Sequence, residues 1–147
     1  MDAAPVSTLA AAAVLPGEDF SRVALSGAAQ DLLRSLRQQH GPLMFHQSGG
    51  CCDGSSPMCY PAGEFLTGDA DVHLGDLDVD EGFAVPVWMS RSQFAYWRHT
   101  HLTIDVVPGR GAGFSLEAPE GVRFLIRSRL LTEAEWATDP TLRVGPA

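Results

Sequence analysis

The 147-residue sequence contains no lysine, because all ten of its basic residues are arginines. A Schiff-base lysine and a phosphate-loop lysine are therefore excluded. A net charge of −8 and the lack of a basic stripe argue against nucleic-acid binding. No apolar run approaches the roughly 20 residues that cross a membrane. Any chemistry must therefore depend on histidine, cysteine, carboxylate or arginine side chains.

Cysteine is scarce, and the three cysteines Cys51, Cys52 and Cys59 lie within nine residues of one another. An odd number of such closely spaced cysteines is a poor disulfide framework. The alanine-rich stretch at 9–15 lacks the basic residue that precedes an export signal, since the first arginine is Arg22. We therefore expect a cytoplasmic protein, where clustered thiols bind metal or do redox chemistry more often than they form disulfides.

The pattern of apolar residues predicts one α+β domain over residues 21–140, between a disordered N-terminal tail at 1–20 and a C-terminal tail at 141–147. A helix is expected at 27–39, with Ser26 as its N-cap and Gly41 at its end. A short helix is expected near the C-terminus, after Thr132. Strands are expected at 43–48, 71–77, 82–89, 102–106, 113–118 and 122–130. The expected architecture is a mostly antiparallel β-sheet or sandwich with these two helices.

The thiols belong to a segment, 49–61, that has three glycines and two prolines and predicts a sharply bent loop. Because thiolates are soft ligands, Cys51, Cys52 and Cys59 would suit iron, zinc or copper. Two alternatives stay open. The thiols could form a metal-free redox group, with the third resolving a mixed disulfide, or they could be buried as small apolar side chains.

Histidines supply the remaining candidate metal ligands. His99 and His101 lead into the strand predicted at 102–106, and because side chains alternate along a strand, they and Asp105 are expected on one face. His46 lies just before the thiol segment. We expect His99, and also His46 or His101, to complete the metal shell, although a surface or hydrogen-bonded core role is the ordinary one for a single histidine.

Three further side chains are candidates for catalysis. Asp53 lies within the thiol segment. Arg110, between two glycines, could hold a carboxylate through two parallel hydrogen bonds. Glu117 is expected on a strand, facing the same side as Ser115, where it could support a metal-bound histidine.

Two resemblances to known families are present. His99-x-His101 with Asp105, followed by the Gly113, Pro119 and Gly121 pattern, resembles the metal motifs of cupins, with Phe124 in place of the second motif's histidine. This resemblance implies a cupin-like sandwich. The stretches 47–60, 96–100, 104–111, 113–117 and 123–129 resemble a bacterial family catalogued as domain of unknown function 779. That resemblance covers about residues 33–136 and favours His99 over His101 as a functional residue.

Members of that family are often encoded beside acetaldehyde or other aldehyde dehydrogenases, which implies a dehydrogenase partner. We therefore expect a small cytoplasmic metalloprotein, an enzyme or accessory factor of aldehyde or alcohol oxidation, with a small-molecule substrate and no nucleic acid or membrane as partner. One alternative is a metal-free thiol redox or aldehyde-reactive protein, and another is a non-catalytic partner or chaperone of the dehydrogenase. The aromatic residues Phe94, Tyr96 and Trp97 would suit a homo-oligomer contact or a core equally.

Overall fold

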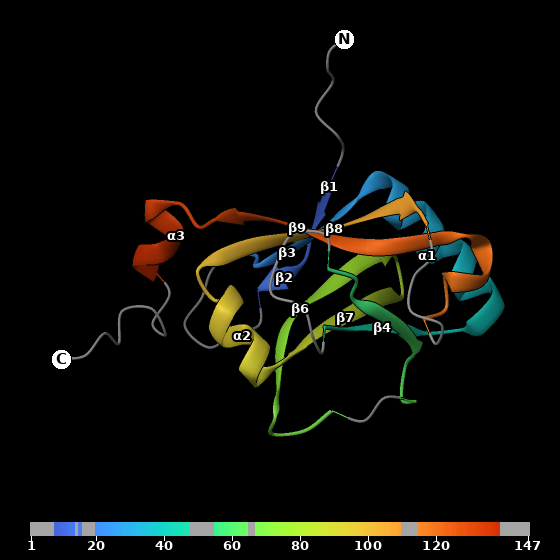
Figure 1. Ribbon diagram of the computed structural model, residues 1–147, viewed down its shortest axis with the longest axis horizontal. Coiled ribbons are helices and arrows are strands. Elements are labelled where there is room, and N and C mark those ends of the chain that lie inside the picture. Colours follow the sequence, from blue (N-terminus) through green and yellow to red (C-terminus); the bar gives the residue numbers. More distant parts are fainter. Residues whose placement is uncertain are drawn as a thin grey trace, which may run out of the picture.

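The computed structural model describes residues 8–13, 15, 20–47, 55–64, 67–109 and 115–138, which fold into an α+β sandwich (Figure 1). Sheet A lies above sheet B in Figure 1. The strand order of sheet A is β1 (Thr8–Ala10), β3 (Val23–Ser26), β8 (Thr100–Pro108) and β9 (Val122–Leu130). That of sheet B is β2 (Ala12–Ala13), β6 (Asp71–Asp80), β7 (Phe83–Ser90), β4 (Leu43–Gln47) and β5 (Met58–Pro61). The helices are α1 (Gly27–His40), α2 (Arg91–Trp97) and α3 (Glu133–Thr138), with a 3₁₀ turn η1 at Ala118–Glu120.

Helix α1 carries the chain from sheet A to sheet B, and its N-terminus is fixed by a short relay of hydrogen bonds. The Ser26 hydroxyl accepts from the Ala29 N–H at 3.2 Å and donates to Asp105 of β8 at 2.7 Å. Gly41, with φ of 79°, ends the helix. The predicted helix and both of its end signals are therefore confirmed. Two strand pairs, β3–β8 and β4–β7, are parallel, and the others are antiparallel.

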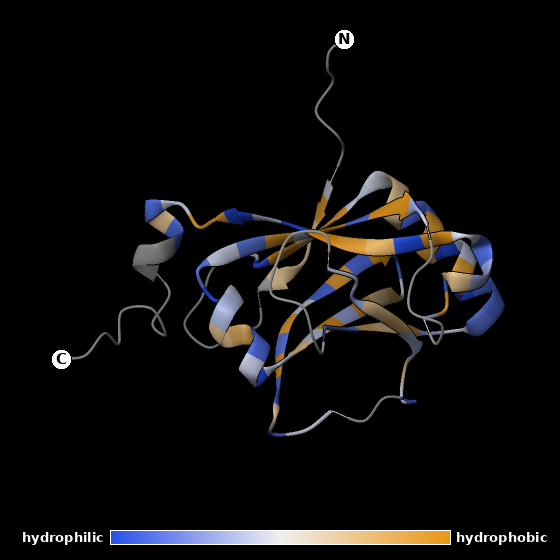
Figure 2. Cartoon of the chain, viewed as in Figure 1, coloured by the Kyte–Doolittle hydropathy of each residue, from blue (hydrophilic) through white to orange (hydrophobic). Residues whose placement is uncertain are grey.

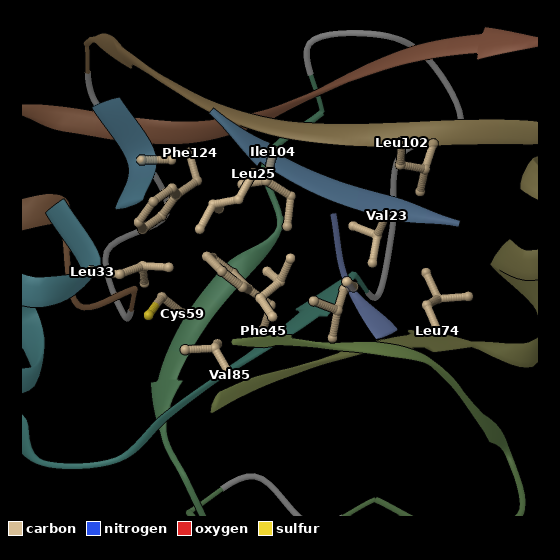
Figure 3. Close-up of a cluster of buried hydrophobic side chains, with 14 of the residues drawn as sticks. Val23, Leu25, Leu33, Phe45, Cys59, Leu74, Val85, Leu102, Ile104 and Phe124 are labelled. Atoms are coloured by element: carbon tan, nitrogen blue, oxygen red, sulfur yellow. The ribbon is translucent and has the colours of Figure 1, made fainter. Parts of the chain in front are cut away.

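The core lies between the sheets, where alternate residues of each strand point inward (Figure 3). Phe45 of sheet B meets Phe124 of sheet A edge to face, with ring centroids 4.9 Å apart. Leu33 of α1 also enters this core. The alternation is visible as orange and blue bands along the strands in Figure 2. None of the helices in the described ranges is long and apolar enough to span a bilayer.

The N-terminal segment differs from the expectation of a disordered tail over 1–20. Strand β1 pairs with β3 in sheet A, and β2 pairs with β6 in sheet B, so residues 8–13 pass from one sheet to the other. Ala11, between the two strands, is buried in the core. The crossing needs small residues on both sides, because Gly75 of β6 lies directly against the alanines. A Cβ at Gly75 would lie 2.8 Å from the Ala12 carbonyl oxygen and 2.9 Å from the Ala11 Cβ.

The strand predicted at 113–118 is also corrected. Ser115 to Glu117 run without strand structure into η1, and β9 pairs along its whole length with β8. The residues Pro119 and Gly121 suit a tight turn, and Gly121, with a φ of 75°, closes the 3₁₀ turn η1. Strand β6 in turn continues to Asp80, three residues beyond its predicted end.

We predict that Gly75→Ala destabilises the protein by about 1–3 kcal/mol, because the added methyl group forces the N-terminal segment away from β6. Urea denaturation of the variant would measure the change. Gly68→Ala is the matched control, since a Cβ there meets no atom within 4 Å, and its stability should stay within about 0.5 kcal/mol of the parent. Equal stability of the two variants would contradict the close crossing.

Candidate functional site

Four of the candidate residues, Cys51, Cys52, Asp53 and Arg110, lie outside the described residues. The chain on both sides of the adjacent thiols is described. It leaves sheet B at Gln47, where β4 ends, and it is held again at Ser55, whose carbonyl accepts the Ile126 N–H of β9 at 2.8 Å. The chain that carries the adjacent thiols therefore departs from sheet B at Gln47 and is next held on sheet A through Ser55.

Cys59, the third thiol, points into the core. It is 0% exposed and pairs across the sheet with Phe45, and Figure 3 shows its sulfur among the side chains between the sheets. Burial raises the pKa of the Cys59 thiol, and the nearby Glu117 carboxyl raises it further. Because the thiolate is both the metal ligand and the nucleophile, this neutral thiol serves as a small apolar core side chain.

His46 faces the opposite side of sheet B from Cys59, since it pairs with Met58 while the preceding residue, Phe45, pairs with Cys59. Its Nε2 lies 2.7 Å from Oδ1 of Asp71, whose second oxygen accepts the Gly68 N–H at 3.0 Å. The hydrogen bond with His46 lowers the pKa of Asp71, so the carboxylate is charged at neutral pH. An ionised Asp71 can accept a proton from Nε2 of the imidazole.

His99 and His101 lie in sheet A or beside it. His101 is opposite Arg129 on the outer face, and burial together with the charge of Arg129 lowers the pKa of His101 to about 4. His99 precedes β8, and its carbonyl accepts the Leu131 N–H at 3.0 Å. Asp105, expected as their partner, instead bonds to Ser26 and, at 2.9 Å, to Arg127.

Asp105 helps to fix the N-terminus of α1, and its negative charge supports this contact. Burial alone would raise its pKa, but hydrogen bonds from Ser26 and Arg127 bring the pKa below the ordinary value. The carboxylate is therefore ionised, and it holds the serine that caps α1. This contact replaces the histidine–carboxylate grouping that the sequence predicts.

Glu117 is fully buried, and with Ser115 it forms a polar bridge between the sheet edges, which we call the clasp. The Ser115 hydroxyl accepts the Cys59 N–H of β5 at 2.8 Å and donates to Glu117. The other Glu117 oxygen accepts the Phe124 N–H of β9 at 3.3 Å. The Leu116 N–H also bonds to the Cys59 carbonyl at 3.0 Å. Burial raises the pKa of Glu117, against the opposing effect of these hydrogen bonds.

The structure therefore brings Glu117 close to Cys59 but places the candidate histidines elsewhere. Cys59 points into the core, His46 lies on the outer face of sheet B, and His101 lies on the outer face of sheet A. Within the described ranges, no three His, Cys, Asp or Glu side chains are grouped to hold a metal ion. The described residues thus do not form the expected shell of Cys59 with His46, His99 or His101.

Sequence reasoning missed Asp71 and the bridging role of Ser115. No local pattern indicates the role of Asp71, because its contact with His46 joins residues 25 positions apart. The alternation in both strands signals that each side chain faces outward, but it does not give the strand order. A second pair of the same kind, His73 with Asp76 at 2.8 Å, lies on β6, where the His73 ring stacks on Trp88.

The fold and these contacts define a small two-sheet α+β protein with a buried acid at a closed sheet edge and histidine–aspartate pairs on an outer face. The chain belongs to the family described as Domain of unknown function (DUF779), whose model matches residues 32–130. No curated protein and no solved structure matches the chain.

We predict that Cys59 resists alkylation while the protein is folded, because its thiol is buried and its pKa is raised. Iodoacetamide labelling followed by peptide mass spectrometry would show Cys59 unmodified under native conditions and modified in denaturant. Labelling of Cys59 in the native protein at a rate near that of a free thiol would contradict its placement in the core.

Removing the Glu117 acceptor should destabilise the fold. Glu117→Ala leaves the Phe124 N–H and the Ser115 hydroxyl without their acceptor in a buried site, at an expected cost of about 3 kcal/mol. Glu117→Gln keeps one acceptor oxygen and should cost less. Urea denaturation at neutral pH compares the two variants, and equal losses would contradict the clasp.

A comparison of the parent protein with Glu117→Gln also tests the pKa of Glu117. A raised pKa means that the folded state keeps its proton at a higher pH than the unfolded state, whose ordinary value is 4.5. The stabilisation is therefore complete below that value and is lost as pH rises toward the folded pKa. The free energy of unfolding of the parent, relative to Glu117→Gln, should fall from pH 4 upward.

Proposed function

We propose that this is a cytoplasmic thiol protein of aldehyde or alcohol oxidation, in which the adjacent Cys51 and Cys52 are the reactive groups. A thiolate of this pair adds to the carbonyl carbon of a small aldehyde. A C–S bond forms while the π bond of the C=O group breaks, and the carbonyl oxygen takes up the proton that the thiol gave up, which yields a hemithioacetal. The addition is reversible and needs no further reactant, so the protein would hold an aldehyde for a dehydrogenase partner.

The placement of Cys59 is the observation that carries this proposal. A metal site with three thiolates needs the Cys59 sulfur as one of its ligands, but the buried thiol faces Phe45 and the core. This burial argues against Cys59 as a ligand in the metal shell expected from the sequence. The two adjacent thiols remain, and the metal-free alternative needs only these two.

The His46–Asp71 pair supports the same chemistry. His46 is five residues before Cys51 in the chain, at the strand end that leads into the thiol segment. The Asp71 carboxylate holds the imidazole by its Nε2 and so orients the ring. A histidine oriented by a carboxylate in this way is the usual general base for a nucleophilic thiol.

The family supports a link to aldehydes at the level of association. The resemblance of the thiol segment and of the stretches around His99 to this family implies a gene neighbourhood with aldehyde dehydrogenases. We therefore propose an aldehyde dehydrogenase as the partner and a small aldehyde as the ligand.

We predict that Asp71→Asn slows iodoacetamide alkylation of Cys51 and Cys52 by about tenfold or more at neutral pH, because the imidazole loses its orienting carboxylate. Asp76→Asn is the matched control, since it breaks the other histidine–aspartate pair and should leave the rate unchanged. Acetaldehyde should protect the two thiols reversibly in the parent protein, and Cys59→Ala should retain this protection.

The two alternative functions, a metal centre and a non-catalytic partner, predict different results. If the protein purified without oxygen carries a transition metal, and a chelator exposes the thiols, they belong to a metal centre and the proposal fails. If acetaldehyde gives no protection and Cys51→Ser with Cys52→Ser leaves binding to the dehydrogenase intact, the protein is a non-catalytic partner.

A further inference from the structure

We infer that an open hollow beside β5 is a binding site for a small organic cation with an apolar body. The hollow has a volume of about 390 Å³ and is lined by Tyr60, Pro61, Glu64 and Leu116. This volume falls within the range of small-molecule sites. The inference does not depend on the proposed thiol chemistry.

Two structural features build the hollow. Leu116 is held against β5 by the hydrogen bond from its N–H to the Cys59 carbonyl, next to the clasp. The chain beyond β5 turns at once, since the Glu64 N–H bonds to the Pro61 carbonyl at 3.1 Å and Gly63 takes a positive φ of 92°. The clasp thus fixes one wall, and the turn places Glu64 beside the other.

The lining is mostly apolar, with an aromatic ring that stays neutral. The Tyr60 hydroxyl donates to the Met58 sulfur at 3.3 Å, and burial raises the pKa of Tyr60, so the ring is a phenol at physiological pH. A neutral phenol ring attracts a cation through its electron-rich face. Pro61 and Leu116 offer aliphatic contacts to the rest of the ligand.

Charge selects the sign of the ligand. Among the described residues that line the hollow, Glu64 carries a charge and none is basic. Three of them come from the stretch between Gln38 and Ser90, which has eight acidic residues and no lysine or arginine. A carboxylate beside an aromatic ring, in an acidic part of the chain, favours an ammonium group over a carboxylate or phosphate.

Three probes of nearly equal size test the inference, namely benzylammonium, benzyl alcohol and benzoate. Each is titrated into the whole protein, and binding is followed by the backbone amide NMR signals of Tyr60, Glu64 and Leu116. We expect benzylammonium to bind about fivefold more tightly than benzyl alcohol, from one partly exposed ion pair and one cation–π contact. Benzoate should bind more weakly than either.

Two variants locate the charge effect. Glu64→Gln should reduce the affinity for benzylammonium to that for benzyl alcohol. Glu81→Gln, which changes the net charge equally at an exposed acid in the turn between β6 and β7, should leave the preference intact. The inference is overturned if benzyl alcohol or benzoate binds as tightly as benzylammonium, if the two variants behave alike, or if no probe shifts the signals of the lining residues. Either set of results leaves the thiol assays above unaffected, so the two proposals fail separately.

Discussion

The hydrogen bond between Ser115 and Glu117 joins the two sheets at the side where β5 and β9 would otherwise present open edges. Unpaired backbone groups at a strand edge attract other strands and are costly when buried. Here the Cys59 N–H bonds to the serine, and the Phe124 N–H bonds to the glutamate. Burying a carboxyl is unfavourable on its own, so the completeness of this small network is what makes the closed edge stable.

The closed edge also fixes the position of Cys59. Cys59 belongs to the strand that the clasp holds, and its side chain fills the core. The chain just before β5 is anchored on β9, where Ser55 contacts Ile126 and Ser56 contacts Arg123. The placement of Cys59 in the core therefore depends on contacts between β5, residues 115–117 and β9.

Alternation along β4 places neighbouring side chains in different surroundings. Phe45 enters the core, and His46, the next residue, faces the outer side of sheet B, where Asp71 meets it from two strands away. The pair His73 and Asp76 lies on the same sheet, where the His73 ring stacks on Trp88. A shift of one residue in register would exchange these environments, so the strand pairing determines which side chains of β4 can meet Asp71.

Local patterns in the sequence were sufficient for the helix that Ser26 begins and Gly41 ends, for most strands, and for the family, because caps, turns and alternation act over a few residues. They were not sufficient for the inward side chain of Cys59, the Glu117 clasp or the strand pairing of residues 8–13. Cys59 and Ser115 are 56 positions apart, and only the packing of one sheet on the other brings them together. The sequence by itself therefore determined the elements and the kinds of reactive side chain, whereas the tertiary structure decided which of them share a surface, because strand order and register arise from contacts between distant segments.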